Sequence, residues 1–199
     1  DVKNVKRLML PDLEAIFVGI KSATSGGRAD YERKCPKCEH ENTFDLNCQL
    51  LLDNMTFVNT DDLVLSFGDE LRVHVRPYDF EMRQMFIKRE FEEEKLVRSL
   101  ETANKDMDEM DRARLMSESV DRLSQVTFTL VSRSIEKIVL LKENVEVTDR
   151  AHINEWLVGI TKTQADMVID AVNRLNAVGV PRAIPVVCSA CGHSWSDNL

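Results

Sequence analysis

The sequence predicts an α+β fold, with a small antiparallel sheet, cysteine knuckles from both chain ends, a long helical hairpin and C-terminal helices. Three observations lead to this prediction. Two Cys-x-x-Cys turns lie near the two ends of the 199-residue chain, short apolar runs fill residues 43 to 77, and a charged stretch with helical spacing follows from 79 to 133. Strands that are followed by a run of helices are typical of α+β proteins.

The first element is predicted to be an amphipathic helix. Pro11 suits its first turn, and Ser25-Gly26-Gly27 ends it. Its apolar face is formed by Met9, Leu13, Ile16, Phe17 and Ile20. Strands are expected at about 29–34 and 43–46, on either side of the first Cys-x-x-Cys turn, as in the hairpin of a zinc ribbon.

The two cysteine motifs are similar in form. One reads Cys35-Pro-Lys-Cys38-Glu-His40, and the other reads Cys188-Ser-Ala-Cys191-Gly-His193. Four thiolates in two such turns make a tetrahedral site for structural zinc, with Zn–S distances of about 2.3 Å. We therefore expect one zinc ion to be held by four ligands, Cys35, Cys38, Cys188 and Cys191. The ion would join the N-terminal part of the chain to its C-terminal end.

Two other interpretations of these cysteines stay open, because Cys-x-x-Cys pairs also occur in redox enzymes and in disulfide frameworks. A redox pair normally opens a helix, whose dipole lowers the pKa of the thiol. Here Pro36 and Lys37 lie inside the first turn, and polar residues follow it. Gly192 follows the second turn and suits a tight knuckle with a residue at positive φ. These features favour zinc.

Three further residues near the motifs have to be assigned. His40 and His193 are alternative ligands, but with four thiolates available we expect them to support the knuckles or to face solvent. Cys48 is the odd fifth cysteine, and we interpret it as a small buried hydrophobic residue.

Three apolar runs predict the strands of a small antiparallel sheet from about 43 to 77. The runs are Met55–Val58, Leu63–Phe67 and Leu71–Arg76. The third alternates apolar and polar side chains, which indicates a strand buried on one face. Pro77 ends the predicted sheet.

A charged helical hairpin is predicted from Asp79 to about Arg133, with a break at Asn104-Lys105-Asp106. Leu96, Leu100, Ala103, Met107 and Met110 keep helical spacing, as do Met116, Val120 and Leu123. Two interpretations of the methionine-rich apolar positions stay open. They fill the core, or they form a stripe that a partner covers. That stripe would contain Met82, Phe86, Leu96, Leu100, Met107 and Met110. The acidic run 90–94 is interpreted as a solvated helix face.

The C-terminal part predicts a strand at Ser134–Leu141 and a short helix at Asp149–Gly159. Thr161-Lys-Thr-Gln164 is a capping box that opens another helix, which Gly179 and Pro181 end. Strands at 183–187 and 193–196 flank the second knuckle. We expect residues 1–78 with 134–199 to form a zinc-stapled core, into which the hairpin 79–133 is inserted.

Composition excludes some classes of protein. Acidic residues number 34 and basic residues 26, so the net charge of −8 argues against a dedicated nucleic-acid binder. No run of about 18 apolar residues exists, and we expect no membrane span. Free thiols in metal-binding spacing imply a reducing compartment. The chain begins at Asp1 and not at methionine, so we expect a fragment of a longer protein.

No catalytic motif is present in the sequence. The four histidines, His40, His74, His152 and His193, form no His-Glu-x-x-His pattern, and Gly-x-Ser-x-Gly is missing. A zinc ion that is held by four cysteines is coordinatively closed and cannot activate water. We therefore expect a protein that is not an enzyme.

The order of these features carries a family resemblance. The pieces are the helix Leu10–Ser22, the Cys35-x-x-Cys38 turn, Leu71–Tyr78 before the long helical region, Ser134–Ile138, Ile153–Leu157 and Cys188-x-x-Cys191-Gly-His193. Over most of its length the chain resembles the baseplate hub proteins of contractile-tailed bacteriophages (myoviruses), the family that includes the hub assembly subunit. The resemblance implies a protein without catalysis that is made in the host bacterial cytoplasm and located in the tail baseplate of the virion. It also implies an oligomeric assembly with other phage baseplate, hub and tail-tube subunits.

The leading functional prediction is thus a zinc-stapled adaptor in a phage baseplate. The alternative is a cellular zinc-ribbon adaptor module in a nucleic-acid-processing complex, and a third class is a thiol redox enzyme. Ribbons that grip nucleic acid show clustered basic and exposed aromatic residues. Here the one small basic group is Arg28, Arg33, Lys34 and Lys37, which either contacts an acidic face of a partner or belongs to a solvated loop.

Overall fold

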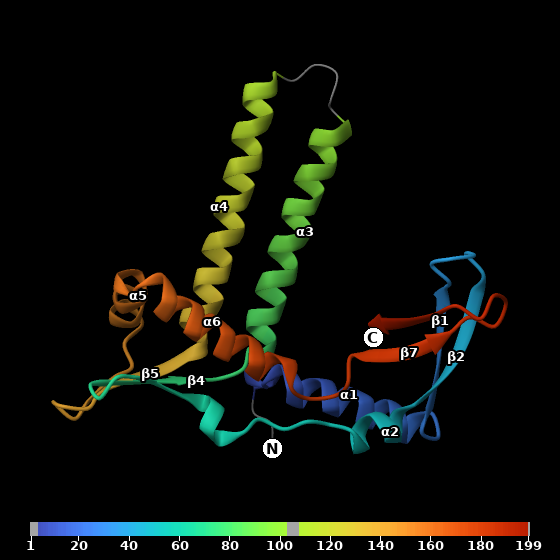
Figure 1. The fold of residues 1–199 in the computed structure, drawn as a ribbon, viewed down its shortest axis with the longest axis horizontal. Helices are drawn as coiled ribbons and strands as arrows, with labels where there is room; N and C mark the ends of the chain where they lie inside the picture. The colour runs from blue at the N-terminus through green and yellow to red at the C-terminus, as the bar shows by residue number, and fades with distance from the viewer. Residues whose placement is uncertain (1–3, 103–107, 199) are drawn as a thin grey trace. The chain divides into compact units, whose positions relative to one another are not determined.

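The structure is a computed structural model that describes residues 4–102 and 108–198 (Figure 1). Its internal contacts divide the chain into two compact units. Unit 1 comprises Asp1–Leu10 and Asn59–Asn176, and unit 2 comprises Pro11–Val58 and Ala177–Leu199. The mixture of helices and small antiparallel sheets confirms the predicted α+β class. The helices expected between 79 and 133 belong to unit 1, while the predicted division into a core and an inserted hairpin stays a prediction.

Unit 1 contains an antiparallel sheet with the strand order β3-β4-β5-β6. The strands are β3 (Val64–Phe67), β4 (Leu71–Val75), β5 (Ile135–Leu140) and β6 (Val145–Val147), and the 3-10 helix η2 (Thr60–Leu63) precedes them. Val73 on β4 lies opposite Ile138 on β5, and both side chains are buried. The alternation of β4 therefore forms a buried face, as predicted, because successive side chains point to opposite sides of a strand.

Two long helices lie between β4 and β5 in the sequence. They are α3 (Phe80–Thr102) and α4 (Glu109–Ser134), which lie side by side in Figure 1. The α3 helix begins at the fully buried Asp79, whose carboxylate accepts a hydrogen bond from the Met82 backbone N–H at 2.9 Å. The predicted break at 104–106, Ala103 and Met107 lie outside the described residues, as does the side chain of Leu100.

One buried carboxylate joins the two long helices and corrects a prediction. The acidic run 90–94 was expected to be solvated, but Glu93 is buried. It accepts hydrogen bonds from Ser119 Oγ at 2.7 Å and from Arg122 Nε at 2.8 Å, both on α4. Burial of this charge is possible because a cation and a hydroxyl compensate it.

Two shorter helices complete unit 1, and both begin where the sequence predicts a helix. Asp149 caps α5 (Arg150–Gly159), accepting from the Ala151 N–H at 3.0 Å. The capping box of α6 (Lys162–Ala177) is confirmed, because Thr161 N–H donates to Gln164 Oε1 at 2.9 Å. The buried faces of these helices are formed by Ile153, Leu157, Val168, Ala171, Val172 and Leu175.

Unit 2 contains two separate two-stranded antiparallel sheets. One is the hairpin of β1 (Arg28–Lys34) and β2 (Glu41–Asn47), and the other is the hairpin of β7 (Ala183–Val187) and β8 (Ser194–Asn198). These four strands were predicted from the residues that flank the knuckles. The predicted first helix is present as α1 (Leu10–Thr24), although Ile16, Phe17 and Ile20 on its apolar face are exposed.

The predicted small sheet from about 43 to 77 is wrong in its strands and in their pairing. Met55–Val58 forms no strand, and only Thr56 makes an isolated bridge, to Gly179. Residues 43–77 do not share a sheet, because β2 pairs with β1 whereas β3 and β4 pair with β5. The helix α2 (Cys48–Asp53) was missed, although its Asn47 cap accepts from the Leu50 N–H. Cys48 itself is buried, as predicted.

None of the helices in the described part of the chain is long and apolar enough to cross a membrane.

Candidate metal centre

The four predicted cysteines come together in unit 2. Their sulfur atoms all lie within 4.8 Å of one another. Cys35 Sγ is 3.8 Å from Cys191 Sγ, and Cys38 Sγ is 3.6 Å from Cys188 Sγ, so each close pair joins the two knuckles. Figure 1 shows β1 and β2, from the first half of the chain, beside β7 from its C-terminal end.

The sulfur spacing separates metal binding from disulfide formation. A regular tetrahedron with Zn–S distances of about 2.3 Å places its sulfur atoms about 3.8 Å apart. A disulfide requires about 2.05 Å. The observed 3.6 and 3.8 Å separations therefore fit four ligands of one metal ion and are too long for a covalent bond. The arrangement can hold a metal ion without moving the backbone.

The two knuckles have the same backbone turn. In the first, Cys35 N–H donates to the His40 carbonyl at 2.9 Å, and Glu39 N–H donates to the Cys35 carbonyl at 2.9 Å. In the second, Cys188 N–H donates to the His193 carbonyl at 2.9 Å and Gly192 N–H to the Cys188 carbonyl at 3.0 Å. The two motifs, which have the same spacing, therefore form the same hydrogen-bonded turn.

The turn requires a left-handed residue one position after the second cysteine. Gly192 has φ 68°, which confirms the prediction for the second knuckle. The equivalent residue of the first knuckle is Glu39, with φ 59°. A side chain at this φ costs free energy that glycine avoids, so the first knuckle is the more strained of the two.

Asn42 connects the two knuckles and was not identified from the sequence. Its side chain is 4% exposed. Its Oδ1 accepts from the backbone N–H of Ser189 at 2.9 Å and from the hydroxyl of Ser189 at 3.0 Å. Its Nδ2 donates to the His40 carbonyl at 2.9 Å and lies 3.7 Å from Cys188 Sγ. One amide thus orients both turns and contacts a sulfur atom.

The pKa values of two thiols in the cluster, Cys188 and Cys38, are shifted in opposite directions. Burial raises the pKa of Cys188, but backbone N–H groups of Cys191 and Ala190 lower it, and the result is about 6. At Cys38 the backbone of His40 lowers the pKa, but the neighbouring thiols, Cys191 first, raise it to about 12. Hydrogen bonds thus favour the ionised form of Cys188, whereas the neighbouring thiols and burial favour the neutral form of Cys38. A bound cation would favour the ionised form of each thiol that it contacts.

His40 and His193 are not among the potential metal ligands. In the described part of the chain, the group of potential ligands consists of the four cysteines. The exposed His40 contributes its backbone carbonyl to the first turn. The ring of His193 stacks on Trp195 with a centroid distance of 6.0 Å and an interplanar angle of 13°. Both positions agree with the expectation that these residues support the knuckles or face solvent.

Aromatic side chains hold the two hairpins together beside the cysteines. Phe44 on β2 lies edge-on to Trp195 on β8, with ring centroids 6.0 Å apart. Phe44 also contacts Tyr31 on β1, with centroids 5.7 Å apart. These half-buried rings give the cysteine cluster a small apolar support of its own.

The basic group of the first hairpin is largely paired with carboxylates inside unit 2. Arg33 contacts Asp197 at 2.9 Å, and Lys34 contacts Glu41 at 3.2 Å. Arg28 is similarly paired with Asp45. These pairs reduce the positive charge that the hairpin presents to a nucleic acid.

The family described as "T4 bacteriophage base plate protein" matches residues 1–198. The chain belongs to this family. No curated protein and no solved structure matches it. Membership implies a structural role in the tail baseplate of a phage and contacts with other baseplate subunits.

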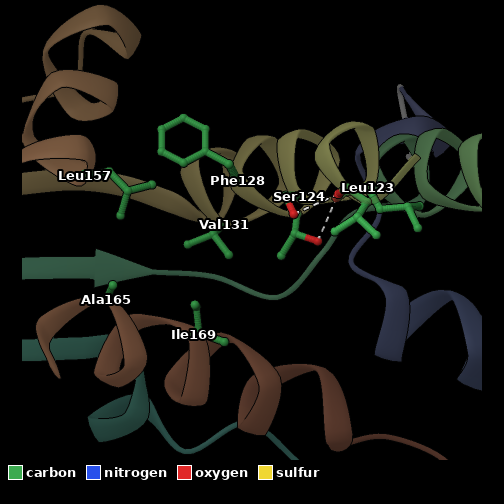
Figure 2. A pocket seen from close by; sticks show the side chains of 9 residues that line it. Leu123, Ser124, Phe128, Val131, Leu157, Ala165 and Ile169 are labelled. Atoms are coloured by element: carbon green, nitrogen blue, oxygen red, sulfur yellow. Dashed lines mark hydrogen bonds between the residues drawn. The ribbon is translucent and has the colours of Figure 1, made fainter. Parts of the chain in front are cut away.

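Unit 1 also has exposed apolar surface, through which the subunits of an assembly can make contact. Unit 1 has an apolar groove of about 440 Å³, shown in Figure 2. Val131 of α4 and Leu157 of α5 lie on one side, and Ala165 and Ile169 of α6 face them from the other. Val120 of α4 also lines the groove and is 60% exposed.

The residues of the predicted methionine stripe differ in burial. Met82 is fully buried in unit 1, so the core interpretation is confirmed at this residue. Met110 and Met116 on α4 are exposed, as are Ile87 and Phe91 on α3. The exposed apolar surface of these helices therefore includes Met110 of the predicted stripe together with residues that were not expected, while Met107 and the side chain of Leu100 lie outside the described residues.

Proposed function

We propose that this chain is a structural or assembly subunit at the hub of a phage contractile-tail baseplate. It acts as an adaptor that binds neighbouring baseplate, hub and tail-tube proteins. The single observation that carries the proposal is the cluster of four cysteines, Cys35, Cys38, Cys188 and Cys191, in a chain that belongs to a baseplate family. The cluster supports a stapled scaffold whose function lies in its surfaces.

The metal in this proposal is one structural zinc ion. A tetrahedral set of four thiolates suits zinc, and separations of 3.6 and 3.8 Å agree with its size. When bound, the ion supplies a cross-link between the two hairpins of unit 2. Asn42 and the turn amides then act as the outer hydrogen-bonding shell that orients the sulfur ligands.

The proposal assigns the protein no catalytic activity. Four cysteine ligands leave a zinc ion without an open coordination position, so neither water nor substrate can reach it. His40 and His193 are then supports of the turns. Replacing both by glutamine should lower stability slightly and leave metal content and assembly unchanged. A disulfide-reductase or hydrolase turnover that disappears in this folded double variant would contradict the assignment.

The apolar groove of unit 1 supports the adaptor role, because its lining includes exposed apolar side chains such as Val120, which contact with a partner would remove from water. We propose that a neighbouring tail subunit covers it. In the test, the chain is co-expressed with the tail and baseplate proteins encoded beside it, and the complexes are measured by native mass spectrometry. The wild-type chain should form a defined complex with at least one of them.

The matched variants are two valine substitutions on exposed helix surfaces. Val120→Glu places a charge in the groove and should abolish the complex. Val158 on α5 is 76% exposed and does not line the groove, so Val158→Glu should assemble normally. Normal assembly of Val120→Glu would reject the groove as the contact surface. A wild-type chain that stays alone with every tested subunit would reject the adaptor function.

A further inference from the structure

Unit 1 contains a small pocket that is lined by four arginine side chains. They come from distant parts of the chain: Arg7 ends the 3-10 helix η1 (Val5–Arg7), Arg76 follows β4, Arg133 lies near the end of α4, and Arg150 begins α5. The pocket measures about 230 Å³. This volume is the share of about seven water molecules in the liquid, so a carboxylate group fits.

Two of the arginines also stabilise the surrounding structure. Arg150 donates hydrogen bonds to the carbonyls of Ser132 at 2.9 Å and Ile135 at 2.7 Å, where α4 ends. These contacts tie the start of α5 to the end of α4 and to the first residue of β5. Arg76 is 14% exposed and pairs with Asp79 at 3.1 Å. Their substitution would therefore disturb the fold as well as the pocket.

The other two arginines are less engaged, and the pocket holds more positive than negative charge. Arg7 is 61% exposed and reaches Asp79 only at 3.8 Å, while Arg133 pairs with Glu81 at 2.8 Å. Among the described residues, the ion pairs of the four guanidinium groups involve these two carboxylates, Asp79 and Glu81. Four positive charges thus stand against two carboxylates in these ion pairs, an excess of two.

The excess of positive charge in the pocket also affects the pKa of Arg150. Burial is the main reason why its pKa is lowered, and the positive charges of Arg76 and Arg133 lower it further. Asp149 and Glu136 act in the opposite direction without reversing the shift. Like charges in close proximity disfavour one another's ionised form, and a bound anion relieves that cost.

We propose that this arginine pocket binds a carboxylate side chain from an acidic segment of a neighbouring protein. Guanidinium groups present paired N–H donors in a plane, which matches the two oxygens of a carboxylate. A nucleic acid fits less well, because its affinity comes from a basic surface that neutralises many phosphates, whereas these four arginines line one pocket of about 230 Å³. The inference rests on the proposed adaptor function and adds the chemistry of a second contact.

The test uses the isolated full chain, so it is independent of whether tail complexes form. Binding of a fluorescein-labelled peptide of consecutive glutamates is measured by anisotropy at about 50 mM salt, where electrostatic attraction is weakly screened. Inorganic phosphate and a single-stranded oligonucleotide serve as competitors. The peptide should bind, its affinity should fall as salt increases, and neither competitor should displace it at concentrations equal to that of the peptide.

The variants separate the pocket from general charge. Arg7→Gln and Arg133→Gln should each weaken peptide binding by about tenfold, because each removes a charged hydrogen-bond donor. Arg114 on α4 is exposed, pairs with Asp111 and lies outside the pocket, so Arg114→Gln should change the affinity less than about twofold. Circular dichroism checks that all variants fold. Absent binding by the wild type, unchanged binding by folded Arg7→Gln, or preferred binding of phosphate or oligonucleotide would overturn the proposal.

Discussion

At the scale of single residues, backbone conformation distinguishes two glycines that look alike in sequence. An added Cβ at either Gly19 or Gly192 would meet no atom within 4 Å. Gly192 has φ 68°, whereas Gly19 lies inside the helix α1. The two residues therefore form a matched pair for testing whether the knuckle turn requires a left-handed residue.

Opposite effects are expected from the same substitution at these two positions. Gly192→Ala should destabilise the protein by about 1 kcal/mol, because alanine is strained at positive φ. Gly19→Ala should stabilise it by about 1 kcal/mol, because alanine favours the helix. Chemical denaturation of both variants measures the free energies of unfolding. Equal effects of the two substitutions would show that the turn does not impose the proposed constraint.

Asn42 offers a second residue-scale prediction, because it hydrogen-bonds to both knuckles. Asn42→Ala should destabilise unit 2 by about 2 kcal/mol, since the buried Asn42 side chain makes hydrogen bonds to Ser189 and His40 that are each worth about 1 kcal/mol. It should also weaken metal binding by about 10- to 100-fold, as loss of groups that orient metal ligands does. A chelator competition titration measures the affinity.

The exposed neighbour Thr43 is the control, and Thr43→Ala should stay within about 0.5 kcal/mol of the wild type. If Asn42→Ala held its metal as tightly as Thr43→Ala, Asn42 would have no role in orienting the sulfur ligands.

The cluster of four cysteines could be predicted from the sequence, whereas the role of Asn42 could not. The two Cys-x-x-Cys turns are local patterns, and their identical spacing indicates a shared role. Asn42 is significant only because Ser189, far away in the sequence, comes within hydrogen-bonding distance. The arginine pocket was missed for the same reason, since its residues come from four separate parts of the chain.

At the scale of elements, the buried Glu93 fixes how α3 and α4 pack. Contacts from Arg122 first and Ser119 second lower the pKa of Glu93 from an ordinary 4.5 to about 2. A carboxyl group with a lowered pKa in the folded state stabilises the fold fully above its unfolded pKa. That contribution decreases as the pH falls from about 4.5 to about 2.

We therefore expect Glu93→Gln to destabilise unit 1 by about 1–3 kcal/mol at neutral pH. The difference from the wild type should shrink as the pH falls below about 4.5. Urea unfolding at several pH values, followed by circular dichroism, measures this dependence. The neighbouring Glu94 is exposed and pairs with Arg98, so Glu94→Gln should have little effect at any pH. A difference for Glu93→Gln that is independent of pH would contradict the ion-pair account.

Helices and isolated strands were predicted better than strand pairing. The capping box at Thr161 and the alternation in β4 are local signals, and both were interpreted correctly. Strand pairing depends on segments that are distant in sequence. For example, β4 pairs with β5, although both long helices lie between these two strands in the sequence. The apolar run at Met55–Val58 was mistaken for a strand, but Phe57 is 78% exposed there and no neighbouring strand pairs with it among the described residues.

At the scale of the whole molecule, each unit is assembled from two distant segments, and the cysteine cluster lies in one of them. Removing the metal should therefore affect unit 2 selectively. Hydrogen exchange after chelation should accelerate in residues 28–47 and 183–198, while α3, α4 and the β3–β6 sheet keep their protection. Uniform acceleration across both units would instead indicate that they unfold cooperatively.

The central claim is that the four cysteines hold one structural zinc ion. The most direct measurement is the metal content of protein purified under reducing conditions, determined by inductively coupled plasma mass spectrometry. The account predicts about one zinc per chain, lost with destabilisation in Cys188→Ser and retained in Cys48→Ala, because Cys48 lies outside the cluster. Structural zinc contributes on the order of 10 kcal/mol to folding. Protein that is metal-free, fully folded and indifferent to chelator would contradict the claim.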